Sequence, residues 1–231
     1  MIPNLGHGNR RYLEIARFLA DQITHGNYAV GDRLPPERNL AQSLAVSRTT
    51  VREALLALEI MKYIEIRVGA GVFVLDESQR EQPAFPELES TSPTDVLATR
   101  RLIEGETAAL AAIAATPEQI DQLETELKKM QDAIDDVPAY DAADARFHEI
   151  IANMAGNELL LTFVSSLWRM RDSAMWSRWY AQTRSRPNRM RAIQDHEDIL
   201  RAIRRGLPDV ARTAMQSHLD ILVDRFFQLK I

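Results

Sequence analysis

The chain has 231 residues, of which 45% are hydrophobic and 26% charged, with a formal net charge of −5 and no cysteine. This composition is typical of a soluble protein with one large or two small domains, and it excludes disulfides, thiol catalysis and cysteine-bound metal. The sequence contains no run of about 18 apolar residues that could span a membrane, and no apolar signal segment is visible. We therefore expect a cytoplasmic protein with no membrane partner.

The first part of the chain predicts three helices followed by a hairpin. Three stretches have apolar residues at helical spacing: 9–26, 36–44 and 48–61. Ser47 is a natural N-cap for the third of them. Two alternating apolar runs then flank Gly69 and predict a two-stranded hairpin. Three helices and a hairpin make a winged helix-turn-helix, so we expect a DNA-binding domain over 1–75.

Cationic and hydroxyl side chains gather at the start of the third helix. The first 77 residues contain nine Lys and Arg and nine Asp and Glu, so only local charge can indicate DNA binding here. Val51 is expected to pack inward, whereas Arg48 and Arg52, four residues apart, are expected on one exposed ridge. A recognition helix reads bases from its first turns, and arginine can fork onto guanine. If this motif stood alone, the alternative would be that the Arg and Thr side chains only form a solvent-exposed face of the helix.

The rest of the chain predicts a linker and a helical bundle. Residues 76–93 are polar, contain prolines and have no period, which indicates a linker. After residue 94 there is no strand signal, and we expect an all-α domain over 94–231. Its five or six amphipathic helices are expected at 94–115, 117–135, 138–154, 157–182, 188–205 and 208–229. The fold class is therefore mainly α.

Three histidines and an aspartate in this second part have the spacing of a metal site. Asp144 and His148 are four residues apart and share one helix face, while His196 and His218 lie on two later helices. Three helices could thus bring one carboxylate and three imidazoles together. Oxygen and nitrogen ligands without sulfur suit Zn, Ni, Mn or Fe. Each histidine alone is more often a surface or hydrogen-bonded core residue, and Asp141 is a weaker candidate.

The N-terminal motifs resemble a known family. The segments LPPER, SRTTVREAL and VGAGVFV are similar to the DNA-binding domain of GntR-type bacterial transcription regulators. The resemblance implies a homodimer that places two winged helices on a short palindromic operator. It also implies these DNA-contacting positions: Arg38, Arg48, Thr49, Thr50, Arg52 and Gly69.

The second part resembles the effector domain of the FadR-type branch of this family. The resemblance rests on the run DARFH, ending at His148, and on two later single histidines. It implies that a divalent metal is bound beside a carboxylate effector by Asp144, His148, His196 and His218. Zinc is the metal that we expect first. The resemblance further implies that Arg100 faces this effector, and Glu104, one turn later, could orient it.

A further resemblance concerns the effector itself. The segments SSLWRMRDSAMW and DHEDILRAIRRGLPDVARTAMQSHLD resemble repressors of hexuronate utilisation, which implies a repressor released by a sugar acid. A sugar acid needs cations for its carboxylate and an aromatic face for its ring, which Arg171, Trp168 and Trp176 could supply together with Arg100. Tryptophans at helical spacing are more often core or dimer contacts.

Other functions remain open at this point. A metal with an open position could activate water in a hydrolase, but no nucleophile or phosphate loop is visible, and an enzyme has no use for a winged helix. The expectation is therefore a regulator and not an enzyme. A regulator could also sense another organic acid or the metal itself. An acyl-CoA sensor would need a large apolar tunnel and no Asp/His set.

Overall fold

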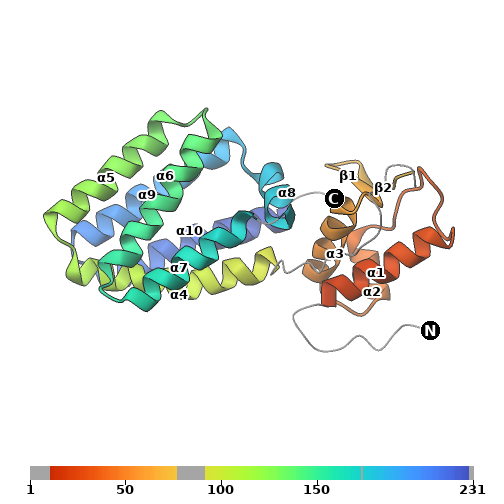
Figure 1. Ribbon diagram of the computed structural model, residues 1–231, viewed down its shortest axis with the longest axis horizontal. Helices are drawn as coiled ribbons and strands as arrows, with labels where there is room; N and C mark the ends of the chain where they lie inside the picture. Colours follow the sequence, from red (N-terminus) through yellow and green to blue (C-terminus); the bar gives the residue numbers. More distant parts are fainter. Residues whose placement is uncertain (1–10, 77–91, 173, 229–231) are drawn as a thin grey trace. The chain divides into compact units, whose positions relative to one another are not determined.

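The computed structural model describes residues 11–76, 92–172 and 174–228, which form two compact units (Figure 1). One unit contains the described residues up to Thr94 and most of helix α8 (Ala174–Thr183), and the other contains Asp95–Asp172 and Gln182–Arg225. The described residues are mainly helical, with one two-stranded sheet. This confirms the predicted fold class, an N-terminal winged helix-turn-helix followed by an all-α bundle.

The first unit is built around its third helix. Its elements are α1 (Arg11–Thr24), α2 (Glu37–Ser43), α3 (Arg48–Ile60), β1 (Ile64–Arg67) and β2 (Gly71–Val74). Ser47 caps α3 by accepting the Thr50 backbone N–H at 3.0 Å, and Ala45 turns the chain between α2 and α3 with a φ of +52°. Residues 51–59 are all buried, so α3 reaches the surface mainly through its first turn.

The hairpin forms the wing. β1 and β2 pair antiparallel, with Ile64 opposite Val74 and Arg67 opposite Gly71. Ile64 and Val74 are buried, which fixes the register because a one-residue slip would expose them. At the tip, Gly69 has a φ of +78° and open space around it, so the backbone there is exposed and unobstructed.

The second unit is a helical bundle. Its helices, with α8 between them in the chain, are α4 (Pro93–Ala114), α5 (Pro117–Asp132), α6 (Val137–Met154), α7 (Glu158–Arg169), the 3-10 turn η2 (Met170–Asp172), α9 (Arg186–Arg204) and α10 (Pro208–Gln228). α5 packs on α6 and α9, and α6 packs on α7. α4 lies beside α10, where Arg101 pairs with Asp220 at 2.6 Å. Buried Leu123, Phe147 and Ile199 belong to the bundle core.

One predicted helix is wrong. The stretch 157–182 forms α7, η2 and α8 instead of a single helix. The 3-10 turn directs Arg171 toward Asp144 and Trp168, and such a tertiary contact leaves no trace in helical periodicity. Most of α8, within the predicted domain 94–231, groups with the winged helix.

Two further expectations concern the linker and the membrane. Of the linker expected at 76–93, residues 77–91 lie outside the described residues, and Pro93 already begins α4. None of the described helices is long and apolar enough to cross a bilayer.

Candidate functional site

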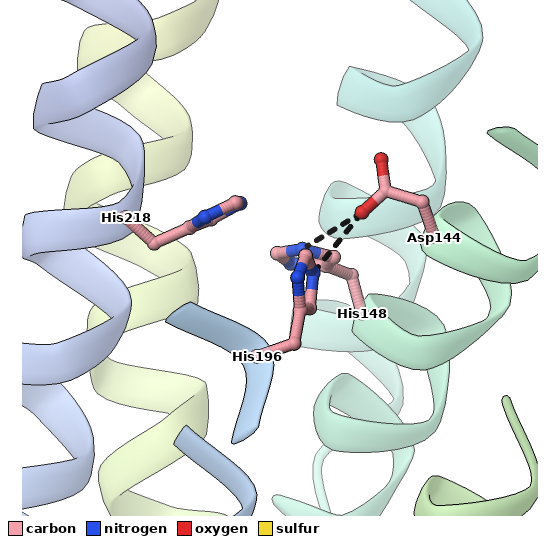
Figure 2. Close-up of side chains that lie close together, drawn as sticks. All are labelled: Asp144, His148, His196 and His218. Carbon is pink, nitrogen blue, oxygen red and sulfur yellow. Dashed lines mark hydrogen bonds and ion pairs between the residues drawn. The ribbon is translucent and has the colours of Figure 1, made fainter. Parts of the chain in front are cut away.

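Four buried side chains with metal-ligating atoms meet inside the bundle (Figure 2). Asp144 and His148 extend from α6, His196 from α9 and His218 from α10. One ligand atom from each residue lies within 4.8 Å of the others. These are the four residues that the sequence predicted as ligands, and the structure brings the whole set together. We call them the Asp/His cluster.

The far side of each imidazole ring has a polar partner. His196 Nδ1 lies 2.6 Å from the carbonyl oxygen four residues earlier on α9, which can only accept, so this nitrogen carries the proton. His148 Nδ1 lies 2.5 Å from the Glu104 carboxylate, and His218 Nδ1 lies 3.5 Å from the Asp195 carboxylate. In His148 and His196 the opposite nitrogen, Nε2, therefore presents a lone pair to the cluster.

The cluster atoms are close enough to share one cation. The Nε2 atoms of His148 and His196 are 3.1 Å apart. Oδ1 of Asp144 lies 3.1 Å from His196 Nε2 and 3.7 Å from His148 Nε2. Such atoms repel unless a cation or proton lies between them. Two ligands of a tetrahedral zinc ion lie roughly 3.4 Å apart, so this donor set fits a divalent metal.

The ionisation states also suit metal binding. Burial alone would raise the pKa of Asp144, but the close contact with His196, the neighbouring imidazole of His148 and the guanidinium of Arg171 hold this pKa well below its ordinary value. Burial lowers the pKa of His218 to about 4. Burial likewise lowers the pKa of His148. A carboxylate and neutral imidazoles are the forms that bind metal ions.

Two arginines and a tryptophan adjoin the Asp/His cluster. The Cζ atoms of Arg100 and Arg171 lie 4.1 Å and 4.3 Å from the centroid of the Trp168 ring. This ring lies 4.9 Å from that of His148, and Arg171 Nη1 reaches Asp144 Oδ2 at 3.3 Å. Trp168 Nε1 is buried and has no hydrogen-bond partner among the described residues. Two guanidinium groups and one indole N–H are therefore concentrated beside the cluster.

The other predicted effector residues have different surroundings. Glu104 accepts a hydrogen bond from Arg100 Nε at 2.5 Å, and both residues are buried beside the cluster. Trp176 lies on α8 in the unit of the winged helix, where its ring packs edge-on against Trp179 at 4.7 Å between centroids. Trp176 is therefore a core residue of that unit, which is the alternative that the sequence analysis gave for tryptophans at helical spacing.

Sequence reasoning missed two contacts of the imidazoles. The spacing of four residues signals the ion pair of Arg100 with Glu104, but not the contact of Glu104 with His148 on another helix. No sequence pattern indicated the contact of Asp195 with His218. Asp195 directly precedes His196 on α9, whereas its partner His218 lies on α10.

The predicted DNA-binding residues lie on the recognition helix, its neighbour and the wing. Those that are exposed or half-buried are Arg38, Arg48, Thr49, Thr50 and Gly69. The hydroxyl of Thr50 already bonds to that of Ser47 at 2.8 Å. Arg67 on β1 is a further exposed cation that the sequence analysis missed, although the alternation of the hairpin puts it on the polar face.

The predicted exposure of Arg52 is wrong. Its side chain is only 2% exposed, and its guanidinium forms two hydrogen bonds of 2.6 Å with the Glu37 carboxylate. Arg52 lies three residues before buried Leu55, so it is on the edge of the face that packs against α2. It therefore joins α3 to α2.

Both parts of the chain match known protein families. Residues 11–74 match the bacterial regulatory proteins of the gntR family, and residues 95–221 match the FCD domain. The "Uxu operon regulator" of Haemophilus influenzae is 33% identical over 222 residues, covering 96% of this chain and 84% of that protein. The "Exu regulon transcriptional regulator" of Escherichia coli is 34% identical over 216 residues, covering 91% and 82%. Among solved structures, Escherichia coli McbR/YncC has the same fold, with a TM-score of 0.54 and 21% identity over 94% of this chain and 97% of that one.

Proposed function

Because the chain belongs to the GntR family of bacterial transcription regulators and carries an FCD domain, we propose that it represses a sugar-acid operon and releases its operator when a sugar acid binds beside a divalent metal. The family makes the protein a DNA-binding regulator and not an enzyme. The observation that carries the proposal is the buried Asp/His cluster, with its facing lone pairs and the adjoining arginines and tryptophan.

In this proposal the winged helix binds a palindromic operator. The first turn of α3 enters the major groove, where Arg48 reaches a guanine, a contact worth about 1–3 kcal/mol of discrimination. Four further positions contact the backbone or the groove edges: Arg38, Thr49, Thr50 and Gly69. Arg52 acts indirectly, because its pairing with Glu37 holds α3 in place.

The cluster residues Asp144, His148, His196 and His218 bind the metal ion. Zinc suits this donor set first, with nickel, manganese and iron as further candidates. The ion supplies positive charge for an effector carboxylate. Arg100 and Arg171 add positive charge, and the Trp168 indole N–H, without a partner among the described residues, donates to an effector oxygen.

The names of the relatives support a sugar acid and repression. Two relatives are named as regulators of the Uxu operon and of the Exu regulon, and an Escherichia coli relative with 28% identity is a "Galactonate operon transcriptional repressor". Together with the resemblance to hexuronate-utilisation repressors, these names favour a hexuronate or a related sugar acid. Operator binding in a bacterium puts the protein in the cytoplasm.

A homodimer completes the proposal. Two half-sites of a palindrome require two winged helices held at a fixed separation. On α4, Leu102 is 64% exposed and Ile113 is 71% exposed, and three helical turns separate them on one stripe. We infer that a second copy of the chain covers this stripe, because a regulator with a palindromic operator needs such a symmetric contact.

Operator binding and metal content test the proposal together. The purified protein is incubated with its own promoter region, and galacturonate, glucuronate, fructuronate and tagaturonate are titrated in a gel-shift assay. We expect one acid to release the DNA from zinc-loaded protein but not from protein treated with a chelator. The His196→Ala variant should lose the metal, keep DNA binding and lose the response to the acid.

The matched control is His25→Ala. This exposed histidine bonds to the Asp21 carbonyl oxygen at 2.7 Å on α1, so its loss should leave metal content and response unchanged. A His196→Ala protein with a full metal load contradicts the ligand assignment. Release by metal alone, with no active acid, makes the protein a metal sensor.

A further inference from the structure

The buried carboxylate of Glu104, like that of Asp144, contacts both an arginine and an imidazole of the site. Glu104 Oε1 accepts from Arg100 Nε at 2.5 Å, and Oε2 accepts from Arg100 Nη2 at 3.3 Å. The same Oε2 lies 2.5 Å from His148 Nδ1. All three side chains are almost completely buried, so water does not screen these contacts.

We propose that Glu104 is a positioning residue through which metal and effector strengthen each other's binding. This inference rests on the function proposed above and assigns to Glu104 a role toward His148 instead of direct contact with the effector. Arg100 touches the effector, His148 touches the metal, and Glu104 joins the two.

The coupling follows from the competition of two donors for one carboxylate. With a metal held at Nε2, the His148 ring would lose electron density, so its Nδ1–H would become a stronger donor to Glu104. Glu104 then neutralises Arg100 less, and the guanidinium attracts an effector carboxylate more strongly. The same factor applies in reverse, because coupling between two binding sites is reciprocal.

Glu104→Gln tests the link with metal binding as the readout. A glutamine keeps one accepting oxygen, but its amide nitrogen cannot accept from the second donor. Affinity for Co²⁺ and Zn²⁺ is measured by competition with a chromophoric chelator, with and without galacturonate or glucuronate, and the visible Co²⁺ spectrum reports the coordination. We expect Glu104→Gln to weaken metal binding about 10–100-fold and to alter the spectrum. In wild-type protein an acid should raise metal affinity by roughly 5–150-fold, and in the variant it should not.

Two further variants separate the coupling from folding. Glu126→Gln changes another buried glutamate, which pairs with Lys129 on α5, and should match wild-type protein. Arg100→Met/Glu104→Gln removes both charges of the buried pair. We expect it to recover most of the metal affinity, because the glutamine oxygen accepts from His148, while the acid no longer changes that affinity.

The outcomes distinguish this inference from the proposed function. If wild-type protein binds no metal, both fail. If wild-type protein binds metal and Glu104→Gln stays within about twofold of it with the same Co²⁺ spectrum, only the role of Glu104 is overturned. A wild-type metal affinity that neither acid changes overturns the coupling.

Discussion

At the scale of single residues, two arginines of α3 differ in role although they are only four positions apart. The Arg48 side chain is 59% exposed, whereas that of Arg52 is buried. The buried carboxylate of Glu37 accounts for the difference, since it binds Arg52 through two hydrogen bonds of 2.6 Å and lies 3.5 Å from Arg48. The first arginine is therefore positioned for an external partner, and the second fixes the helix.

Alanine substitutions should separate these roles. Arg48→Ala is expected to weaken operator binding roughly ten- to hundredfold at unchanged stability, because it removes a surface contact. Arg52→Ala leaves Glu37 buried without its main partner and should lower the free energy of unfolding by about 3–5 kcal/mol. Gel shifts and urea unfolding measure the two effects. An equal loss of stability in both variants would contradict this division.

The Asp/His cluster could be predicted from the sequence, but its surroundings could not. A spacing of four residues places Asp144 and His148 on one face of a helix, and few other residue types offer metal-ligating atoms. Glu104 lies 44 positions before His148, and only tertiary packing brings them together. Arg52 was misplaced for the same reason, since its partner Glu37 lies on another helix.

At the scale of elements, helix starts were more predictable than helix interruptions. Thr116 and Gln119 form a capping box, and Ser185 caps α9 through its side chain, so local chemistry marks these boundaries. Between α7 and α8 no glycine or proline interrupts the pattern. The interruption at Met170–Asp172 accompanies the contacts of Arg171 with Asp144 and Trp168.

The exposed stripe of α4 carries the prediction at this scale. Ile113→Glu adds a charge where we infer the contact with a second copy, and desolvating that charge is costly. The variant should be a monomer with unchanged helical content, and its operator affinity should fall because two half-sites no longer bind together. Light scattering after gel filtration measures the mass. Val30→Glu, at an exposed apolar residue of the winged helix, is the control, and a dimeric Ile113→Glu would remove α4 from the interface.

At the scale of the whole molecule, the proposed function needs binding of the effector to change how the recognition helix binds DNA. η2, which carries Arg171, is followed in the chain by α8, most of which groups with the winged helix. There Arg178 Nε donates to Glu59 Oε2 of α3 at 2.9 Å, and Glu59 Oε1 accepts the Ile66 N–H of β1 at 2.8 Å. Glu59 therefore joins the recognition helix, the wing and α8.

Arg178→Ala tests whether this junction carries the response. The Asp/His cluster and its arginines are unchanged in the variant, so metal content and acid affinity should equal those of wild-type protein. In the proposed function the acid releases DNA because it binds the DNA-competent and incompetent states with different affinity. Arg178→Ala removes the contact of α8 with Glu59 of α3, through which we expect that difference to reach the recognition helix. Operator affinity, measured by fluorescence anisotropy with and without the acid, should respond less to the acid than in wild-type protein. Arg201→Ala, in an exposed pair with Asp198 on α9, should respond fully. A full response in Arg178→Ala as well would mean that the signal reaches α3 without the α8 contact.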